Sequence, residues 1–362
     1  MQRVGWIRIG ALGDLLVGLA SLREALDFWP HAKFSVVGSK LWLQILEPGY
    51  WPQIDRIVVV EKRGNAAEIY DYKQGGWKKR SESSLAAELR SGYTAVFNAR
   101  VDSPRQGFAA FWAWVPERWG SAEGVARFIY NRRGPHDGKD PLIHERDVPL
   151  LLMDEAEALA HEDTKFSGKN LADRISASAR IRKWRGQGLP APRRLDSSAV
   201  KKEIGSDRYF IVNPTSSRKE KAWPAAKFRS LLDEIGKRDL YRGVKPIVVG
   251  SPVESEWLRE VAGDRYQIVQ PSSIGELFDV VSGAEFLVTN TSSVQFIAAS
   301  VATRTLTLMG RARPEIWGPL GPSDLFVLGV EPASVESMFE RELLAYESIS
   351  VETVLERLRA FA

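Results

Sequence analysis

Four short stretches combine small, hydroxyl-bearing, acidic or basic residues at points where an apolar run gives way to a helix-compatible one. GALGD, residues 10–14, follows the apolar-rich VGWIRIG and places Asp14 at an expected helix start. NPTSSRKEKAWP, residues 213–224, sets hydroxyl groups and a lysine ahead of Pro224, which suits a first helical turn. VVGSPVESE (248–256) and VTNTSSVQFIAAS (288–300) have the same strand–turn–helix character. In open α/β sheets, ligands bind at such carboxyl ends of strands.

The second and fourth stretches have the chemistry of an anion site. Hydroxyl groups, a lysine and the free backbone N–H groups of a helix start can together hold a phosphate. The residues concerned are Thr215, Ser216, Ser217 and Lys221 in the second stretch and Thr291, Ser292 and Ser293 in the fourth. A polar surface loop beside a capped helix is the alternative. TLMGRARPEIWGPLG, residues 307–321, follows as a Gly- and Pro-rich loop able to wrap a ligand.

The first and third stretches each present a carboxylate. Gly10 and Gly13 permit a tight turn and close approach of a ligand, with Asp14 directed towards it. Aspartate is also a good helix N-cap, and this role alone would account for Asp14. Glu254 opens a helix where a carboxylate can accept hydrogen bonds from ribose hydroxyls. A favourable interaction with the helix dipole is an equally weighted explanation for Glu254.

Composition narrows the class of protein. The 362 residues suffice for two domains, and 44% hydrophobic with 27% charged residues is typical of a globular protein. The net charge of +4 favours anionic ligands without requiring nucleic acid, and we expect no nucleic-acid partner. The absence of cysteine excludes disulfides and thiolate chemistry. The four histidines lie far apart without metal-ligand spacing, so we expect neither a metal nor another cofactor.

The start of the chain does not resemble a signal peptide, because Arg8 and Asp14 interrupt the apolar segment that one requires. No uninterrupted apolar run reaches the roughly 18 residues of a membrane span. We therefore expect a cytoplasmic protein.

Short apolar runs alternate with longer amphipathic stretches, which predicts βαβ units and parallel sheets. The expected strands are VGWIRI, KFSVVG, RIVVV and YTAVFNA in the first half, and RYFIVN, KPIVVG, YQIV, EFLVT and RTLTLM in the second. The expected helices span 14–28, 82–91, 224–237, 253–262, 273–283 and 292–300, and a last helix has Val351, Val354, Leu355 and Leu358 on one face.

These elements predict an α/β protein with two Rossmann-like, doubly wound domains. The Pro-, Gly-, Ser- and Arg-rich stretch between them, within 178–207, has little apolar periodicity and reads as a connector. We expect an N-terminal Rossmann-like domain over 1–180, a linker over 181–207, a second Rossmann-like domain over 208–335 and a C-terminal helical segment over 336–362.

Two further features of the first half are open to interpretation. Lys73, Lys78, Lys79 and Arg80 predict a basic, solvated loop, with loose attraction to an anionic membrane leaflet as the alternative. The segment 98–120 is rich in aromatic residues, which we expect to lie mostly in the core; a surface that meets a membrane interface is the alternative. These residues are Phe108, Phe111, Trp112, Trp114 and Trp119.

In the order of these stretches, the chain resembles glycosyltransferase family 9, the bacterial lipopolysaccharide heptosyltransferases. The resemblance covers nearly the whole chain. The similar segments are RIGALGDLL, HERDVPLLLMDEAEAL (144–159), NPTSSRKEKAWP, VVGSPVE, GRARPEIWGPLG and ISVETVLERL. The resemblance implies the GT-B fold, in which two Rossmann-like domains face a central cleft. It implies that the domain over 1–180 binds the acceptor and that the domain over 208–335 binds the nucleotide sugar. It also implies transfer of a sugar from an ADP-linked donor, most simply ADP-heptose, to an anionic lipopolysaccharide core or another cell-envelope glycan.

The resemblance assigns roles to individual residues. Asp14 falls on the general base, Lys221 on the lysine that stabilises the leaving diphosphate, and Glu254 on the ribose ligand. Ser216 and Ser217 fall on the phosphate-binding hydroxyls. Inversion at the anomeric carbon, without a covalent intermediate or a metal, is implied. On the acceptor side we expect Gly13, Arg100 and Arg105, because guanidinium groups pair with carboxylates or phosphates. Peripheral contact with the cytoplasmic face of the inner membrane is a further expectation.

The fourth stretch departs from the family pattern. Thr291 stands where the family has an aspartate that holds sugar hydroxyls, Ser293 where it has glycine, and Phe296 where it has histidine. A neutral hydroxyl forms weaker hydrogen bonds than a carboxylate. The donor sugar therefore differs, another residue substitutes, or the protein is a degenerate relative that binds nucleotide or glycan without transfer. A third alternative, an α/β oxidoreductase, lacks the GxGxxG fingerprint.

Overall fold

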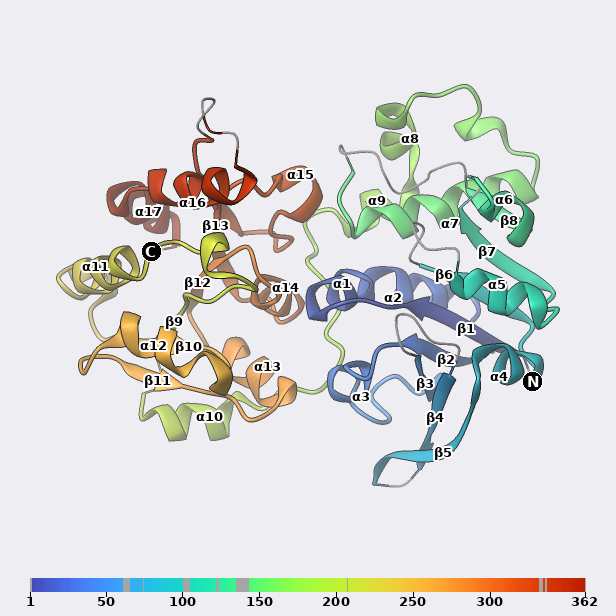
Figure 1. The fold of residues 1–362 in the computed structure, drawn as a ribbon, viewed down its shortest axis with the longest axis horizontal. Helices are drawn as coiled ribbons and strands as arrows, with labels where there is room; N and C mark the ends of the chain where they lie inside the picture. Colours follow the sequence, from blue (N-terminus) through green and yellow to red (C-terminus); the bar gives the residue numbers. More distant parts are fainter. Residues whose placement is uncertain are drawn as a thin grey trace. The chain divides into compact units, whose positions relative to one another are not determined.

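The computed structural model describes residues 2–60, 66–73, 75–99, 105–121, 124–134, 143–206, 208–331, 335 and 337–361. The chain divides into two compact domains (Figure 1). The first comprises Met1–Arg185 and Pro192–Arg194, and the second comprises Gly186–Ala191 and Leu195–Ala362. Each domain contains one sheet with helices packed against it. The predicted class, α/β with two doubly wound domains, is confirmed.

The first domain is built on an eight-stranded sheet of order β5-β4-β3-β2-β1-β6-β7-β8, in which only β4 and β5 run antiparallel to their neighbours. Its strands are β1 (Arg3–Arg8), β2 (Lys33–Gly38), β3 (Ile54–Val60), β4 (Ala66–Lys73), β5 (Gly76–Ser84), β6 (Ala95–Asn98), β7 (Glu117–Ser121) and β8 (Arg132–Gly134). Strands β1, β2 and β6 are almost wholly buried, as near-continuous apolar runs predict for parallel strands covered on both faces.

The helices of this domain follow the predicted alternation, with one break. Gly18 separates two helices in the stretch 14–28, where we expected one. The described helical segments are α1 (Leu12–Val17), α2 (Leu19–Phe28), α3 (Trp42–Ile45), α4 (Leu85–Arg90), α5 (Arg105–Trp112), α6 (Ala126–Ile129), α7 (Asp147–Ala160), η1 (Thr164–Phe166), α8 (Leu171–Ala177) and α9 (Ala179–Trp184).

The prediction of a basic loop at 73–80 was wrong, because Lys73 ends β4 and Lys78, Lys79 and Arg80 lie within β5. The two strands form an antiparallel hairpin added to the edge of the parallel sheet. Lys79 Nζ of β5 binds Glu68 of β4 at 2.5 Å, and this ion pair joins the two strands. Lys79 also binds Glu82 of its own strand at 2.5 Å. The β5 sequence has few apolar residues, so its period-2 pattern is too weak to signal a strand.

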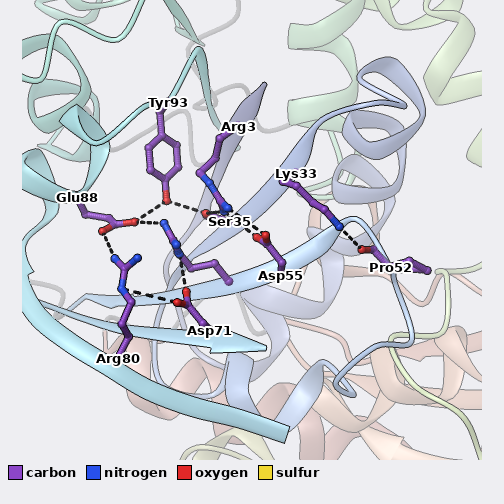
Figure 2. Close-up of polar contacts among 10 residues, drawn as sticks. Arg3, Lys33, Ser35, Pro52, Asp55, Asp71, Arg80, Glu88 and Tyr93 are labelled. Atoms are coloured by element: carbon purple, nitrogen blue, oxygen red, sulfur yellow. Dashed lines mark hydrogen bonds and ion pairs between the residues drawn. The ribbon is translucent and has the colours of Figure 1, made fainter. Parts of the chain in front are cut away.

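A buried ionic cluster joins this hairpin to the rest of the sheet (Figure 2). Glu88 of α4 accepts hydrogen bonds from Arg56 at 2.6 Å, Arg80 at 2.8 Å and the Tyr93 hydroxyl at 3.1 Å. Arg56 also binds Asp71 of β4 at 2.7 Å. Burial raises the pKa of the Tyr93 hydroxyl, and the negative charge of Glu88 raises it further. The buried Glu88 side chain therefore has three hydrogen-bond donors, two of which are guanidinium groups.

Most of the aromatic residues predicted for the core lie on the surface instead. Only Trp119 is buried, and the exposed ones are Phe108, Phe111, Trp112 and Trp114. The reason is that α5 buries its small and polar residues, Gln106, Gly107 and Ala110, against the domain. Its aromatic side chains consequently point outwards, contrary to the usual helical pattern.

The second domain has a six-stranded parallel sheet of order β11-β10-β9-β12-β13-β14. The order matches that of a doubly wound dinucleotide-binding sheet, with its topological switch point between β9 and β12. The strands are β9 (Tyr209–Asn213), β10 (Lys245–Val249), β11 (Gln267–Val269), β12 (Phe286–Asn290), β13 (Arg304–Met309) and β14 (Leu325–Leu328).

The helices of the second domain pack in two groups, one containing α11, α12 and α17 and the other α10, α13 and α14. Helix α17 buries Val354, Leu355 and Leu358, the face predicted from its periodicity. The helical segments are α10 (Ser197–Ile204), η2 (Lys219–Lys221), α11 (Ala225–Gly236), η3 (Asp239–Tyr241), η4 (Pro252–Glu254), α12 (Ser255–Ala262), α13 (Ile274–Ser282), α14 (Ser293–Ser300), α15 (Pro314–Trp317), α16 (Met338–Ser348), α17 (Val351–Leu358) and η5 (Arg359–Phe361).

The stretch 178–207, interpreted from composition as a connector, contains helices α9 and α10. The side chains of Ser178 and Asp196 cap their N-termini. Short helices of this kind depend on capping and a few buried residues more than on periodicity, which explains why the sequence pattern does not reveal them. None of the described helices is both long and apolar enough to cross a bilayer.

Asp324 gives the second domain a predicted pH dependence. Burial raises the pKa of its carboxyl to about 6, although the backbone N–H groups of Gly321 and Thr305 lower it. The native carboxyl then holds its proton more tightly than the unfolded chain does, so native stability falls as the pH rises from about 4 to 6. Asp324→Asn cannot ionise. We expect the free energy of unfolding of this variant, taken relative to that of the wild type, to rise by on the order of 2 kcal/mol between pH 4.5 and 7.5.

Urea unfolding at the two pH values measures this gain. Asp233→Asn is a matched control, because hydrogen bonds from Tyr266 and Arg265 hold the pKa of that half-buried carboxyl below its usual range. The prediction would be contradicted if the free energies of unfolding of Asp324→Asn and of the wild type differed by the same amount at both pH values.

Candidate functional sites

The opening turn of the first domain holds Asp14 at the third position of α1, directly after β1. Asp14 is not the N-cap of α1, because Ala11 holds that position. The Asp14 carboxylate instead accepts a hydrogen bond of 2.9 Å from the backbone N–H of Ala11, so it contributes to the capping of the helix from within its first turn. The side chain is only half-buried, however, and it also lines a cavity. Capping and contact with a ligand are therefore compatible.

Two neighbours fix this turn in place. A β-carbon at position 10 would collide with the Asp14 side chain, so the glycine makes room for the carboxylate. The buried guanidinium of Arg8 donates to the Asp14 carbonyl oxygen at 2.8 Å and to the Ala99 carbonyl oxygen at 2.8 Å. Arg8 thus joins the turn after β1 to the end of β6. Sequence reasoning had used Arg8 only as a residue that interrupts an apolar run.

The cavity beside Asp14 has a volume of about 810 Å³. It is lined by apolar residues of β3 and of the turn after β1, and by polar groups from the loop after β2 and from the hairpin. Its described lining is Ile9, Gly10, Ala11, Asp14, Ser39, Lys40, Val59, Val60, Ala66, Ala67, Glu68 and Glu82. An apolar floor with a few polar groups is typical of a pocket for a small molecule or a sugar. Ser39, Lys40 and the hairpin residues were not foreseen.

The other residues expected on the acceptor side are less well placed. Gly13 lies in α1, next to Asp14 but not in the lining of the cavity. Arg105 begins α5 and is exposed. Arg100 lies outside the described residues. Of the two that the structure describes, Gly13 is adjacent to Asp14 in α1, and Arg105 does not line the described cavity.

In the second domain, an amide network joins the loops that follow β9 and β12, the two strands at the switch point. Asn213 donates to the Val249 carbonyl oxygen at 2.8 Å and accepts from the Thr289 hydroxyl at 3.0 Å. Asn290 donates to the Pro214 carbonyl oxygen at 2.7 Å and accepts from the Trp223 backbone N–H at 2.9 Å. The network fixes the NPTSS and NTSS loops side by side, where such a sheet binds its ligand.

A second cavity, of about 420 Å³, opens at these loops. It brings together three predicted residues, Ser217, Lys221 and Thr291, with residues from the 310–317 loop and α16. The latter are Arg311, Ala312, Arg313, Ile316, Trp317, Glu342 and Tyr346. The lining carries three cationic side chains and one carboxylate, Glu342. Arg311 pairs with Glu331 at 3.0 Å and Arg313 with Glu315 at 3.9 Å, whereas Lys221 has no ion-pair partner among the described residues. The cavity is therefore suited to an anion.

The remaining predicted residues of this domain line neither of these cavities in the described part of the chain. Thr215 is buried and accepts from Asn213 at 3.2 Å. Ser292 caps α14, and its hydroxyl lies 3.1 Å from that of Thr289. Ser216 and Ser293 are half-buried. Glu254 accepts from both the backbone N–H and the hydroxyl of Ser251 at 2.7 Å, so it closes a capping box.

Sequence reasoning missed five side chains that line the second cavity. They are Arg311, Arg313, Trp317, Glu342 and Tyr346. The loop that carries the two arginines had been identified as able to wrap a ligand, and the pair of arginines in GRAR was the available signal for an anion. Tyr346 belongs to α16, some 30 residues further along the chain, and only the tertiary fold places it here.

The structure also places the residues that depart from the family pattern. The Thr291 hydroxyl donates to the Leu308 carbonyl oxygen at 3.4 Å. It also forms a side-chain hydrogen bond with Tyr346. Burial raises the pKa of the Tyr346 hydroxyl. Phe296 is buried, with its ring centroid 6.4 Å from that of Trp317. Gln295 donates to the Trp317 carbonyl oxygen at 2.9 Å, which ties α14 to the 310–317 loop. Phe296 is thus a core residue, whereas Thr291 still lines the cavity.

Within the described ranges, no group of three or more His, Asp and Glu side chains is arranged to hold a metal ion.

Comparison with known proteins relates the chain to one family. The model of glycosyltransferase family 9 (heptosyltransferase) matches residues 158–343. Lipopolysaccharide heptosyltransferase 1 of Salmonella typhimurium is 22% identical over 336 residues, which are 90% of this chain and 93% of that protein.

Two solved structures share the fold. One is a glycosyl transferase family 9 protein from Veillonella parvula, with a TM-score of 0.72, 18% identity and coverage of 99% of this chain and 97% of that one. The other is E. coli heptosyltransferase WaaC with ADP-2-deoxy-2-fluoro heptose, with a TM-score of 0.64, 16% identity and complete coverage of both chains. The similarity extends over both domains.

Proposed function

This chain belongs to glycosyltransferase family 9, the heptosyltransferase family, and from that premise we propose that it transfers a heptose or a related sugar from an ADP-linked donor. The proposed acceptor is a lipopolysaccharide core or another anionic cell-envelope glycan. The observation that carries the proposal is the second cavity, whose lining has three cationic side chains, Lys221, Arg311 and Arg313, and one carboxylate, Glu342. Arg311 and Arg313 also pair with Glu331 and Glu315, so Lys221 is the cation that no ion pair holds among the described residues. A diphosphate is the kind of ligand that such an excess of positive charge favours.

We assign the chemistry to the residues as follows. An acceptor hydroxyl oxygen attacks the anomeric carbon while Asp14 takes its proton. The bond between the anomeric carbon and the phosphate oxygen breaks, and the nucleoside diphosphate leaves with the electron pair. Lys221, with Ser217 beside it, stabilises the negative charge that grows on the diphosphate. A single displacement of this kind inverts the anomeric carbon and needs no covalent intermediate and no metal.

The identity of the donor rests on two arguments. The solved E. coli relative was captured with an ADP-linked heptose analogue, which favours adenosine diphosphate as the carrier here. The sugar end is less constrained, because Thr291 offers a hydroxyl where the family has a carboxylate. Ser216 and Glu254, which line neither cavity, keep their proposed roles as phosphate and ribose ligands, as do Thr215, Ser292 and Ser293 as neighbours of the donor.

Replacing Lys221 by alanine is expected to weaken ADP binding by roughly 10- to 100-fold, the usual contribution of a charge-assisted hydrogen bond. Titration calorimetry with ADP measures this effect without an acceptor. Lys219→Ala removes the same charge from the same turn, η2, at an exposed side chain outside the cavity. Unchanged affinity in Lys221→Ala, or an equal loss in Lys219→Ala, would contradict the proposed role.

Thr291 and Phe296 favour one other function, a degenerate GT-B protein that binds nucleotide or glycan without transfer. Both residues replace groups that the family uses, and Phe296 has become part of the core. Incubation with ADP-heptose carrying a labelled sugar separates the two functions. Appearance of label in a heptose-deficient lipopolysaccharide acceptor supports transfer, whereas ADP binding with no labelled product supports the degenerate protein.

The proposed acceptor also implies where the protein works. A glycolipid core is reached at a membrane surface, so we propose peripheral contact with the cytoplasmic face of the inner membrane. Arg105 and Arg100 remain candidates for its acidic groups.

A further inference from the structure

Helices α5 and α6 of the first domain expose an unusual set of apolar side chains. We call them the α5–α6 aromatic face, which consists of Phe108, Phe111, Trp112, Trp114, Val125 and Phe128. Trp114 is 84% exposed, Phe128 70% and Trp112 64%. Large aromatic side chains in such numbers are rarely left in water by a protein that has no partner for them.

The members of this face are neighbours in space. Helices α5 and α6 pack against each other and lie together beside β7 at one edge of the domain (Figure 1). The rings of Phe111 and Trp112 are 5.8 Å apart. Arg118 joins the two helices, because it donates to the Val115 carbonyl oxygen after α5 at 2.6 Å and to the Ile129 carbonyl oxygen of α6 at 2.7 Å. The face is therefore one surface and not a scatter of single residues.

The backbone of Trp114 indicates that its exposure is built into the fold. Its φ angle is +58°, in the left-handed region that bulky side chains rarely adopt. The turn is held by hydrogen bonds from Trp114 N–H to Phe111 and from Val115 N–H to Ala110. Trp114 thus occupies a left-handed turn that follows α5, and its indole ring is exposed there.

Arginines surround the aromatic rings. The guanidinium of Arg127 lies 4.7 Å from the centre of the Phe128 ring, and that of Arg118 lies 5.5 Å from the Phe111 ring. Arg90 donates to the Trp112 carbonyl oxygen, and Arg133 to the Arg127 carbonyl oxygen. The described carboxylate of this region, Glu117, is paired with Arg132. The face therefore combines exposed tryptophans with an excess of positive charge.

We propose that the α5–α6 aromatic face docks the enzyme on an anionic lipid bilayer. Tryptophan rings are preferred at the membrane–water interface, where the apolar ring enters and the N–H stays wet. Arginines at the same level bind lipid phosphates and gain from the negative surface potential. The inference names the surface for the membrane contact proposed above and uses neither Asp14 nor Lys221.

Flotation of the full-length protein with vesicles tests the inference. We expect binding to vesicles of phosphatidylcholine with 30% phosphatidylglycerol, at least about tenfold weaker binding to pure phosphatidylcholine, and a fall in binding as salt is raised. A double variant, Trp112→Ser with Trp114→Gly, should lose at least about tenfold in affinity for the anionic vesicles. Because glycine tolerates the φ angle of residue 114, this variant should keep its thermal stability.

Two further variants make the test specific. Arg127→Gln with Arg133→Gln should cost roughly fivefold per residue on anionic vesicles. Phe339→Ser removes an equally exposed aromatic side chain from α16 of the second domain and should bind vesicles like the wild type. ADP binding, measured by calorimetry, should be unchanged in all of them, so that loss of docking is distinguished from loss of the proposed donor site.

Three results would overturn the inference. The first is no binding of the wild type to anionic vesicles, and the second is an equal loss in Phe339→Ser. The third is a concentration-dependent dimer, detected by light scattering, that the Trp112→Ser, Trp114→Gly variant abolishes, because the face would then be a contact between two copies of the chain.

Discussion

Asp14→Asn is expected to reduce sugar transfer by at least about a thousandfold while ADP binding stays at the wild-type level. A side-chain amide can still accept the hydrogen bond from the Ala11 N–H, so the start of α1 is preserved. It cannot take a proton from the attacking hydroxyl, which would then have to lose that proton to water. The change therefore removes the base and leaves the turn intact.

The measurement is the rate of transfer from ADP-heptose to a heptose-deficient lipopolysaccharide, together with calorimetry of ADP. Asp27→Asn is the control, because it makes the same chemical change at an exposed position at the end of α2. Wild-type turnover in Asp14→Asn would remove Asp14 from the mechanism. A parallel loss of ADP affinity would instead assign the residue to the architecture of the site.

Glu88→Ala is expected to destabilise the first domain by about 3–5 kcal/mol, the usual cost of leaving a buried charge without its partner. Glu88 is almost fully buried, and its loss deprives Arg56, Arg80 and the Tyr93 hydroxyl of their shared acceptor. Arg56 is itself largely buried and would retain only Asp71. The hairpin β4–β5 should be the first element to loosen, because Arg80 and Asp71 both belong to it.

Urea unfolding, with the transition of the first domain followed separately, measures this loss. Glu82→Ala removes a glutamate from the same hairpin, where it is exposed and pairs with Lys79, and should cost less than about 1 kcal/mol. Similar losses in the two variants would show that burial of the cluster contributes little. Hydrogen exchange that is faster in β5 than in β1 of Glu88→Ala would place the loosening in the hairpin.

The alternation of apolar runs predicted the two parallel sheets well, because strands buried on both faces appear in sequence as unbroken apolar segments. The strands β1, β2 and β9 to β13 lie within a residue or so of the predicted runs. The hairpin β4–β5 was missed for the opposite reason. Its strands are held by ion pairs such as Lys79 with Glu68, and a charged strand has no apolar period to detect.

The candidate sites divide in a similar way. Asp14, Ser217, Lys221 and Thr291 were found because they follow strand ends directly, and strand ends converge at the switch point of a sheet. Tyr346 and Glu342 were not found, because α16 reaches the site only through packing of distant segments. The aromatic residues of α5 were misplaced because apolar residues normally face inwards, and on α5 that rule fails.

The outermost position of β5 in the first sheet has a consequence for how the protein behaves in a crowded solution. A strand at the end of a sheet has unpaired backbone N–H and C=O groups, which can recruit a strand from another molecule and begin aggregation. This edge strand carries four charged side chains, those of Lys78, Lys79, Arg80 and Glu82. Any incoming strand would have to desolvate these groups, so the added hairpin discourages unwanted intermolecular pairing.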